Sequence, residues 1–447
     1  MWGRLVTCGP ISNRPSPVGL ATLRILVTAL LLALAASASA ADTKQRTKTI
    51  RDLAKTGSTA IPKIAPYLSD PDIDVRLEAV KAIVDLDTQH SLDPLVKATS
   101  DNDPEIQIRA TDGLVNFYLP GYIKTGLTAP LRRAGAAVKS RFTDTNDQMI
   151  DAFIQVRPEV VQALGRLARS GASMDSRAHA ARAAGILRGR AAVPDLVAAT
   201  RSKDTDLIYE SLIALQKIND PSAGPGVEFL LHDLNEKVQL AAIETVGLLH
   251  DQAAIAGLRD VLDITKSAKV KHAALASMAM LPDPELRRVY LNFLPSKEDD
   301  LRQASTEGLA RLKNPADLPR IQQGFEDEKK TALRLAMAFA LVHLGKHDNT
   351  DFSPLRYVIN QLNSAGYRST ARAYLIELAH DQTVRTSLYP SLSQGLASKD
   401  EKTGLAQVLS AAGDRDSIPY LDELSKDPDH DVAQEGLRSL RTLRSRL

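Results

Sequence analysis

The feature that most constrains this chain is a two-helix unit that returns about every 32 residues, most clearly at 235–262. The first half of that stretch predicts a helix with one apolar stripe, formed by Val238, Ala242, Val246 and Leu249. After a short connection, the second half predicts a helix with its own stripe, formed by Ile255, Leu258 and Leu262. Each unit is therefore a helical hairpin with two apolar stripes to bury.

The same spacing recurs along most of the chain. Positions equivalent to Val238 occur at 75, 108, 176, 207, 238, 270, 301, 333, 367, 401 and 432, with intervals of 31 to 34 residues apart from one of 68. That long interval equals two periods, with one unrecognisable unit between them. The second position of each stripe is nearly always small, which indicates that neighbouring helices approach closely. Such a period predicts stacked hairpins that bury their stripes against one another without a single large core.

A second regular feature marks where the partner helices begin. In several units a proline directly follows the first apolar residue of the second helix. A proline in the first helical turn loses no hydrogen bond, because its N–H would have no acceptor within the helix. We therefore predict helix starts at Pro62, Pro194, Pro319 and Pro419.

Residues 1–40 differ from the rest of the chain. Arg4, Arg14 and Arg24 precede an apolar run over 25–36, and small residues follow it. A basic flank, a short apolar segment and a small-residue site are typical of a secretion signal, here with cleavage near Ala40. The run is short for a bilayer span, and an uncleaved anchor is the alternative. We expect a secreted or periplasmic protein of the bacterial envelope, with no membrane insertion after cleavage.

Removal of this signal changes both the charge and the cysteine content. It takes three arginines and no acid from 56 basic and 54 acidic residues, and leaves 53 against 54. A nearly neutral chain has no global attraction to nucleic acid or anionic lipid. The only cysteine, Cys8, is lost as well, which excludes disulfides and thiolate sites from the exported product.

The remaining chain divides by how regular the repeat is. Residues 41–59 are polar, with a weak helix around 50–54, and are predicted to be a lead-in or partial cap. Hairpins follow over 60–118 and continue from 158 to 447, where an arginine-rich last helix is predicted to cap the array.

The segment 119–157 breaks the rhythm with glycines, prolines, basic residues and aromatics. Insertions in repeat proteins often become loops that carry binding residues, whereas a diverged repeat unit is an equally good interpretation. It is the best single candidate for a specific site. The candidate partner-binding residues are Tyr122, Lys124, Arg132, Arg133, Lys139 and Arg141.

Two features carry a resemblance to a known family. A basic residue follows the anchor position in eight of eleven units, and an acidic turn precedes the anchor, as in the phrase LSDPDIDVRLEAVKAI at 68–83. This phrase resembles the HEAT repeat, particularly the short form grouped with phycobilisome lyase repeats. The resemblance covers about residues 60–447 apart from the irregular segment.

The resemblance implies an all-α, right-handed α-solenoid of about 11–12 hairpins, in which one helix of each pair lines a concave face. It also implies ladders of aspartate and arginine between neighbouring turns, since aspartates cap helix starts and arginine forks satisfy carboxylates. We interpret these arginines as structural. They are Arg76, Arg109, Arg177, Arg302, Arg334 and Arg368.

Two enzyme classes share this repeat, and neither fits well. Bilin lyases and related isomerases act on cytoplasmic proteins, which the secretion signal disfavours, and the iron-dependent hydroxylases hold their metal with His-Glu pairs that this sequence lacks. Five His-Asp pairs are present, but they fall in different repeats and registers, which disfavours a shared metal. The pairs begin at His232, His250, His347, His380 and His430.

No nucleotide-binding, zinc-protease or hydrolase motif occurs in the sequence. We therefore expect no catalytic residue, cofactor or metal site, and we expect an exported, non-enzymatic scaffold that binds another protein on its concave face. The alternative is a repeat-based enzyme or metal-binding protein that uses the His-Asp pairs.

Overall fold

The computed structural model of the chain describes residues 41–123, 148–393 and 397–447. Within those ranges the chain is helical and contains no strand, which confirms the predicted all-α class. It forms two compact units, with the boundary between Ala98 and Thr99. The predicted secretion signal lies outside the described residues. None of the helices in the described ranges is long and apolar enough to cross a membrane.

In the described part of the first unit, residues 41–54 are helical, a longer stretch than the sequence indicates. Ile50 on this helix is fully buried. Short helical turns follow, and then the longer α3 and α4, so the predicted lead-in is itself a packed helix. The α-helices of this unit that follow residues 41–54 are α2 (Ile61–Ile64), α3 (Ile73–Leu86) and α4 (Leu92–Ala98).

The second unit contains the rest of the described helices. Up to the middle of the chain they are α5 (Pro104–Tyr118), α7 (Pro158–Ser170), α8 (Met174–Ile186), α9 (Val193–Ala199), α10 (Thr205–Ile218), α11 (Glu236–Leu248), α12 (Ile255–Ile264) and α13 (Ala268–Ala279). Beyond it they are α14 (Arg287–Phe293), α15 (Asp299–Leu312), α16 (Leu318–Asp327), α17 (Thr331–His343), α18 (Pro354–Asn360), α19 (Arg368–Leu378), α20 (Gln382–Ser393), α21 (Lys399–Ala412), α22 (Ile418–Leu424) and α23 (His430–Arg446).

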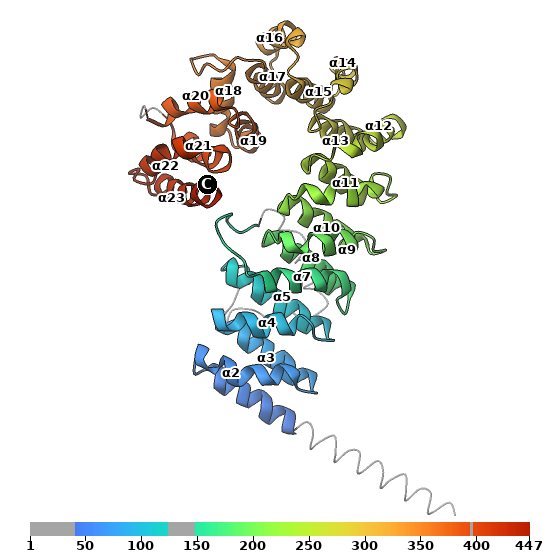
Figure 1. Cartoon of the computed structure of the whole chain (residues 1–447), viewed down its shortest axis with the longest axis vertical. Helices are drawn as coiled ribbons and strands as arrows, with labels where there is room; N and C mark the ends of the chain where they lie inside the picture. Colours follow the sequence, from blue (N-terminus) through green and yellow to red (C-terminus); the bar gives the residue numbers. More distant parts are fainter. Residues whose placement is uncertain (1–40, 124–147, 394–396) are drawn as a thin grey trace, which may run out of the picture. The chain divides into compact units, whose positions relative to one another are not determined.

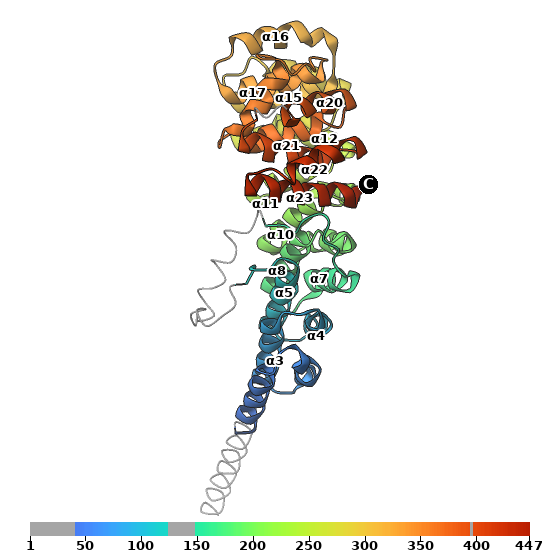
Figure 2. The ribbon, with the colours of Figure 1, turned by 90° about the vertical axis from the view of Figure 1, so that its left-hand side faces the viewer.

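The helices of this unit stack as consecutive hairpins, and the fold is an α-solenoid, as predicted. Each long helix packs against the next long helix along the stack, for example α11 on α13 and α13 on α15. Figure 1 shows α12, α14 and α16 on the outer side of the curve, and α13, α15 and α17 on its inner side. In the view turned by 90°, α21, α22 and α23 follow one another in chain order (Figure 2).

The apolar stripes read from the sequence form the core between stacked helices. Val238, Ala242 and Val246 are each no more than 1% exposed. The small second position is buried wherever it is alanine or serine, because the neighbouring helix lies directly against it. These fully buried residues are Ala79, Ala180, Ser211, Ala242, Ala274, Ser305 and Ala371.

The turns follow the predicted chemistry. The side chains of Asp103, Asp204 and Asp429 accept hydrogen bonds from backbone N–H groups in the first turn of α5, α10 and α23. The expected helix starts are confirmed as well, because proline occupies the first turn of four shorter helices. These prolines are Pro62 in α2, Pro194 in α9, Pro319 in α16 and Pro419 in α22.

Helix α5 packs directly against α8, although 119–157 separates α5 from the hairpin of α7 and α8. His179 Nε2 lies 2.5 Å from Asp112 Oδ1, and the Ala172 backbone N–H donates to Gln107 Oε1 over 2.9 Å. Both views show α5 beside α8 (Figures 1 and 2). The anchor positions 108 and 176, which are 68 residues apart in the chain, therefore lie on helices that pack directly against each other.

Candidate binding groove on the inner side of the curve

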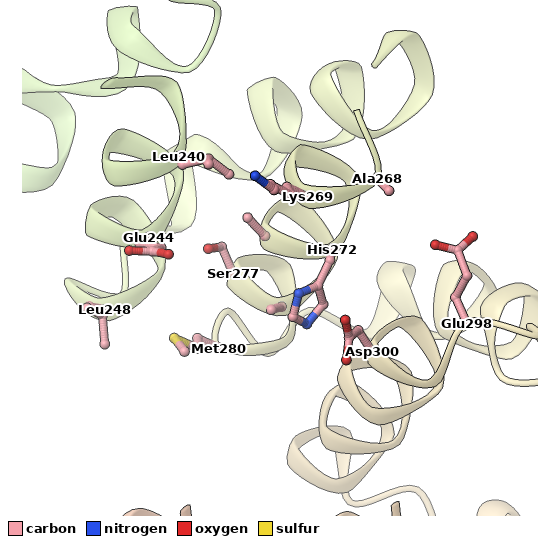
Figure 3. A pocket seen from close by; sticks show the side chains of 12 residues that line it. Leu240, Glu244, Leu248, Ala268, Lys269, His272, Ser277, Met280, Glu298 and Asp300 are labelled. Atoms are coloured by element: carbon pink, nitrogen blue, oxygen red, sulfur yellow. The ribbon is translucent and has the colours of Figure 1, made fainter. Parts of the chain in front are cut away.

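The inner side of the second unit carries a groove where α11, α13 and the start of α15 come together. Helix α13 buries Val270, Ala274 and Met278 against its neighbours, and the periodicity of the helix then places His272 and Ala276 on the open side. We call the resulting surface the inner groove, a cavity of about 550 Å³. It is lined by Leu240, Glu244, Leu248, Ala268, Lys269, His272, Ala273, Ala276, Ser277, Met280, Glu298 and Asp300 (Figure 3).

The floor of the inner groove is closed because α11 and α13 approach each other closely. A Cβ atom on Gly247 would lie 2.8 Å from the Cβ of Ser277, so only glycine fits at that position. The Ser277 hydroxyl is buried and donates to the Ile243 carbonyl over 2.8 Å. This bond satisfies the polar group beneath an otherwise apolar floor.

The walls of the inner groove combine apolar and ionisable side chains. Leu248 at the end of α11 is 40% exposed, so a leucine on the inner side faces the groove and not the core. Glu244 is accessible to solvent, yet the surrounding protein desolvates it and raises the pKa of its carboxyl, an effect that the nearby His272 opposes. Figure 3 shows these two side chains reaching into the groove from α11 and from α13. Such a mixture suits an apolar ligand segment flanked by a charged or hydrogen-bonding group.

One repeat further on, the inner side is closed by side chains. The α15–α19 cluster comprises Glu307 and Arg311 on α15, Phe339 and His343 on α17, and Tyr374 and Glu377 on α19. Arg311 donates two parallel hydrogen bonds of 2.8 Å to the two carboxylate oxygens of Glu377. The Tyr374 hydroxyl donates to Glu307, and its ring stacks on Phe339 with the centroids 4.2 Å apart. Contacts between α15 and α19 thus reach across the intervening α17.

The ionisation states in the α15–α19 cluster follow from burial and pairing. Burial acts to raise the pKa of Glu377, but the contacts with His343 and Arg311 outweigh it and lower this pKa to about 2. Burial and the neighbouring Glu307 carboxylate raise the pKa of the Tyr374 hydroxyl. The cluster therefore holds an ionised glutamate, a neutral tyrosine and a paired guanidinium at neutral pH.

The sequence indicates five separate His-Asp pairs, and the structure brings parts of two of them together. His347, His380 and Asp381 line one cavity of about 290 Å³, which His343 and Glu377 of the α15–α19 cluster also line. His343 Nε2 lies 3.3 Å from Glu377 Oε1. Across the described ranges, no three histidine, cysteine or carboxylate side chains are placed so that they could share one metal ion.

The candidate partner-binding residues of 119–157 are mostly beyond what the structure describes. Tyr122 lies in the turn after α5, and its backbone N–H donates to the Leu119 carbonyl over 3.1 Å. The other five residues, Lys124, Arg132, Arg133, Lys139 and Arg141, lie outside the described residues.

The predicted ladder arginines have several different partners. Arg302 and Arg368 reach carboxylates of the next repeat, with Nη1 of Arg302 3.3 Å from Glu328 and Nη2 of Arg368 2.5 Å from Asp400. Arg109 pairs with Glu105 on its own helix.

Four of the ladder arginines contact backbone carbonyls or aromatic rings. The guanidinium of Arg76 donates to the Asp70 carbonyl, that of Arg177 to the Ala168 carbonyl, and that of Arg368 to the Leu362 carbonyl, over 2.8 to 3.0 Å. Arg334 lies over the rings of Phe325 and Tyr357, 4.8 and 4.9 Å from their centroids.

Comparison with known proteins matches part of the sequence to a family. Residues 28–115 match the family model described as HEAT repeats. No curated protein matches the sequence.

Three solved structures are similar to parts of the chain. The complex of CpcE and CpcF of phycocyanin lyase from Nostoc sp. PCC7120 is 17% identical over 61% of this chain and 94% of that one, with a TM-score of 0.36. Human deoxyhypusine hydroxylase is 18% identical over 64% and 96%, with a TM-score of 0.26. Importin beta is 13% identical over 86% and 57%, with a TM-score of 0.37. Scores of this size carry no argument about function.

Proposed function

We propose that this protein is a non-enzymatic scaffold that binds a segment of another protein in the inner groove. The observation that carries the proposal is the groove itself, which has a closed apolar floor and ionisable side chains around it. It lies on the inner side of a stack whose apolar stripes are buried between neighbouring hairpins. The open Leu248 is therefore available to a ligand and not to the core.

The groove also indicates what kind of segment it would accept. A cavity of about 550 Å³ holds one or two large apolar side chains and not a folded domain. Glu244, Glu298 and Asp300 supply carboxylates around it, against the basic Lys269 and His272. A helix with apolar residues on one face and a basic residue beside them would satisfy both features.

The test is a pair of matched substitutions in the purified full-length chain. Ala276→Arg places a long cationic side chain in the groove, whereas Ala256→Arg places the same side chain at an exposed position of α12, a helix on the outer side of the curve. We expect a protein from the native cells to be retained by the parent chain and by Ala256→Arg and released by Ala276→Arg. Retention of the same proteins by both variants would contradict the proposal.

Export is part of the proposal and rests on the sequence of residues 1–40. Amino-terminal sequencing of the protein recovered from the periplasm or the medium should begin near Ala41, after cleavage near Ala40. Recovery of the whole chain from the cytoplasm, beginning at Met1, would contradict export without affecting the groove.

A second candidate function is catalysis at the cavity lined by His343, His347 and His380. The observation that favours it is that three histidines from two repeats line one cavity together with Glu377 and Asp381. Turnover of a small molecule by the purified chain, lost in a His347→Ala variant, would favour this second candidate.

A further inference from the structure

Another cavity lies where the last hairpins of the second unit return to a segment near residue 150. It has a volume of about 300 Å³ and is lined by residues 149–152, by Arg188 after α8, and by side chains of α19, α21 and α23. Nε of Arg438 on α23 lies 2.6 Å from Asp151 Oδ1, although 287 residues separate the two in the chain. Figure 1 shows the segment that precedes α7 running toward α23. We call this space the closure cavity.

The charges around the closure cavity are not balanced. Three guanidinium groups line it, from Arg188, Arg372 and Arg438, against the two carboxylates of Asp151 and Glu435. Arg438 engages both carboxylates, with Nη1 3.8 Å from Glu435 and two nitrogens on Asp151. Its pairing leaves the other two guanidinium groups of the cavity without a carboxylate partner among the described residues.

Each of the two remaining arginines has donors to spare. Arg372 donates from Nη1 to the neutral amide oxygen of Gln407. The side chain of Arg188 makes no hydrogen bond or ion pair with any described residue, and it is exposed to solvent. A guanidinium carries five N–H donors, so most of those on Arg188 and Arg372 face the cavity or water.

The surroundings of Arg188 make its positive charge costly. Burial by the protein around the cavity lowers the pKa of its guanidinium, and the nearby Asp151 only partly opposes this. The group is thus reachable by water and yet partly desolvated, as expected for a side chain on the inside of a curved stack. Such a cation gains more from an anionic partner than a fully hydrated one does.

We propose that the closure cavity is a binding site for an oxyanion, held between the guanidinium groups of Arg188 and Arg372. The planar fork of arginine matches the two oxygens of a carboxylate or a phosphate. The volume admits a small molecule that bears such a group, and Ser410, Ser439 and Thr442 also line the space. Occupation of the site would join Arg188, at the end of α8, to Arg372 on α19.

The experiment is a thermal unfolding titration of the full-length chain with inorganic phosphate and, in a second arm, with succinate. Sodium chloride at matched ionic strength corrects for screening. We expect at least one of the two anions to raise the unfolding temperature saturably while chloride does not. The arm that responds identifies the source of the oxyanion as phosphate or carboxylate.

Two substitutions and a matched control locate the site. Arg188→Met and Arg372→Met should each weaken binding of the responding anion by about tenfold or more, as expected when charge-assisted hydrogen bonds are lost. Arg190→Met removes a nearby arginine whose side chain is 74% exposed and should leave the affinity unchanged. Melting in chloride alone shows whether each variant folds. Where a methionine variant does not fold, lysine at the same position, which keeps the charge and loses the fork, replaces it.

Two results would overturn the proposal. One is an unfolding temperature that responds to phosphate and succinate no more than to chloride. The other is a parent-like affinity in Arg188→Met and Arg372→Met, or an equal loss in Arg190→Met, because either would place the bound anion elsewhere on the surface.

Discussion

Two neighbouring regions on the inner side of the second unit use the same repeat in opposite ways. Around α13, inner positions hold Ala273 and Ala276, and the inner groove remains open. Around α17, the α15–α19 cluster fills the corresponding space, and Arg311 reaches Glu377 two repeats further along the chain. The comparison shows that the apolar stripes determine the stack, whereas side chains outside the stripes determine whether its inner side is open or closed.

The largest expected loss of unfolding free energy should be similar in the two regions. Val246 beneath the inner groove and Leu309 beneath the α15–α19 cluster are both fully buried stripe residues. Replacing either by aspartate buries an unpaired charge between stacked helices and should cost about 4 kcal/mol or more of unfolding free energy. Chemical denaturation measures it. A parent-like midpoint in either variant would mean that the register of the repeat is wrong.

The next effect should separate the regions. Arg311→Met leaves Glu307 and Glu377 without their shared guanidinium, and removing one partner of this partly buried group of ion pairs should cost about 2–3 kcal/mol. In the inner groove, Lys269→Met should change the free energy of unfolding by less than about 0.5 kcal/mol, since an exposed charge contributes little. If urea denaturation gave the same loss of unfolding free energy for both variants, the α15–α19 cluster would contribute no more to stability than the inner groove does.

A smaller effect concerns α15, the helix that both regions share. A Cβ atom on Gly308 would lie 2.5 Å from the Tyr290 ring, which α14 packs against it. Gly308→Ala should therefore cost about 1–3 kcal/mol through overpacking, in spite of the better helix propensity of alanine. Gly366→Ala is the matched control, because a Cβ atom added there would have no neighbour within 4 Å. Thermal melts that rank the two variants in the reverse order would contradict this packing.

The smallest expected effect is a difference in pH dependence between the two regions. The pKa of Glu377 is lowered to about 2 in the folded state, so its stabilising contribution is complete above its ordinary pKa and is lost as pH falls toward 2. Allowing for its partial exposure, we expect about 1–2 kcal/mol. The pKa of Glu244 is raised, so lowering the pH relieves its desolvation and acts in the opposite direction.

Urea denaturation between pH 5.5 and pH 3 measures this difference. The Glu377→Gln variant should lose less stability than the parent over that interval, and Glu244→Gln should lose slightly more. Parallel curves for the parent and both variants would contradict the assigned shifts.

The sequence was sufficient to predict the hairpins and their stripes because burial between adjacent repeats has a fixed period. Ala242 and Ser211 could be identified as close-packing positions from one column of small residues. The contact between Arg311 and Glu377 could not be predicted, because 66 residues separate them and the curvature of the stack decides which helices converge. One signal was available: α17 is apolar on almost every side, as expected for a helix enclosed by its neighbours.

The inner groove was missed for a related reason. Lys269, His272 and Ala276 occupy positions that a period alone cannot distinguish from an ordinary solvated face. The interval of 68 residues likewise could not show that α5 and α8 pack against each other, as the contact between His179 and Asp112 does.

The central claim, that the inner groove is where this protein binds its partner, is tested most directly by photocrosslinking in the native cells. A photoreactive amino acid at Ala273, in the groove, should give a discrete crosslinked product that is lost when Ala276→Arg is added. The same amino acid at the exposed Ala256 of α12 should not give that product. An identical product from both positions, or one that persists with Ala276→Arg, would contradict the claim.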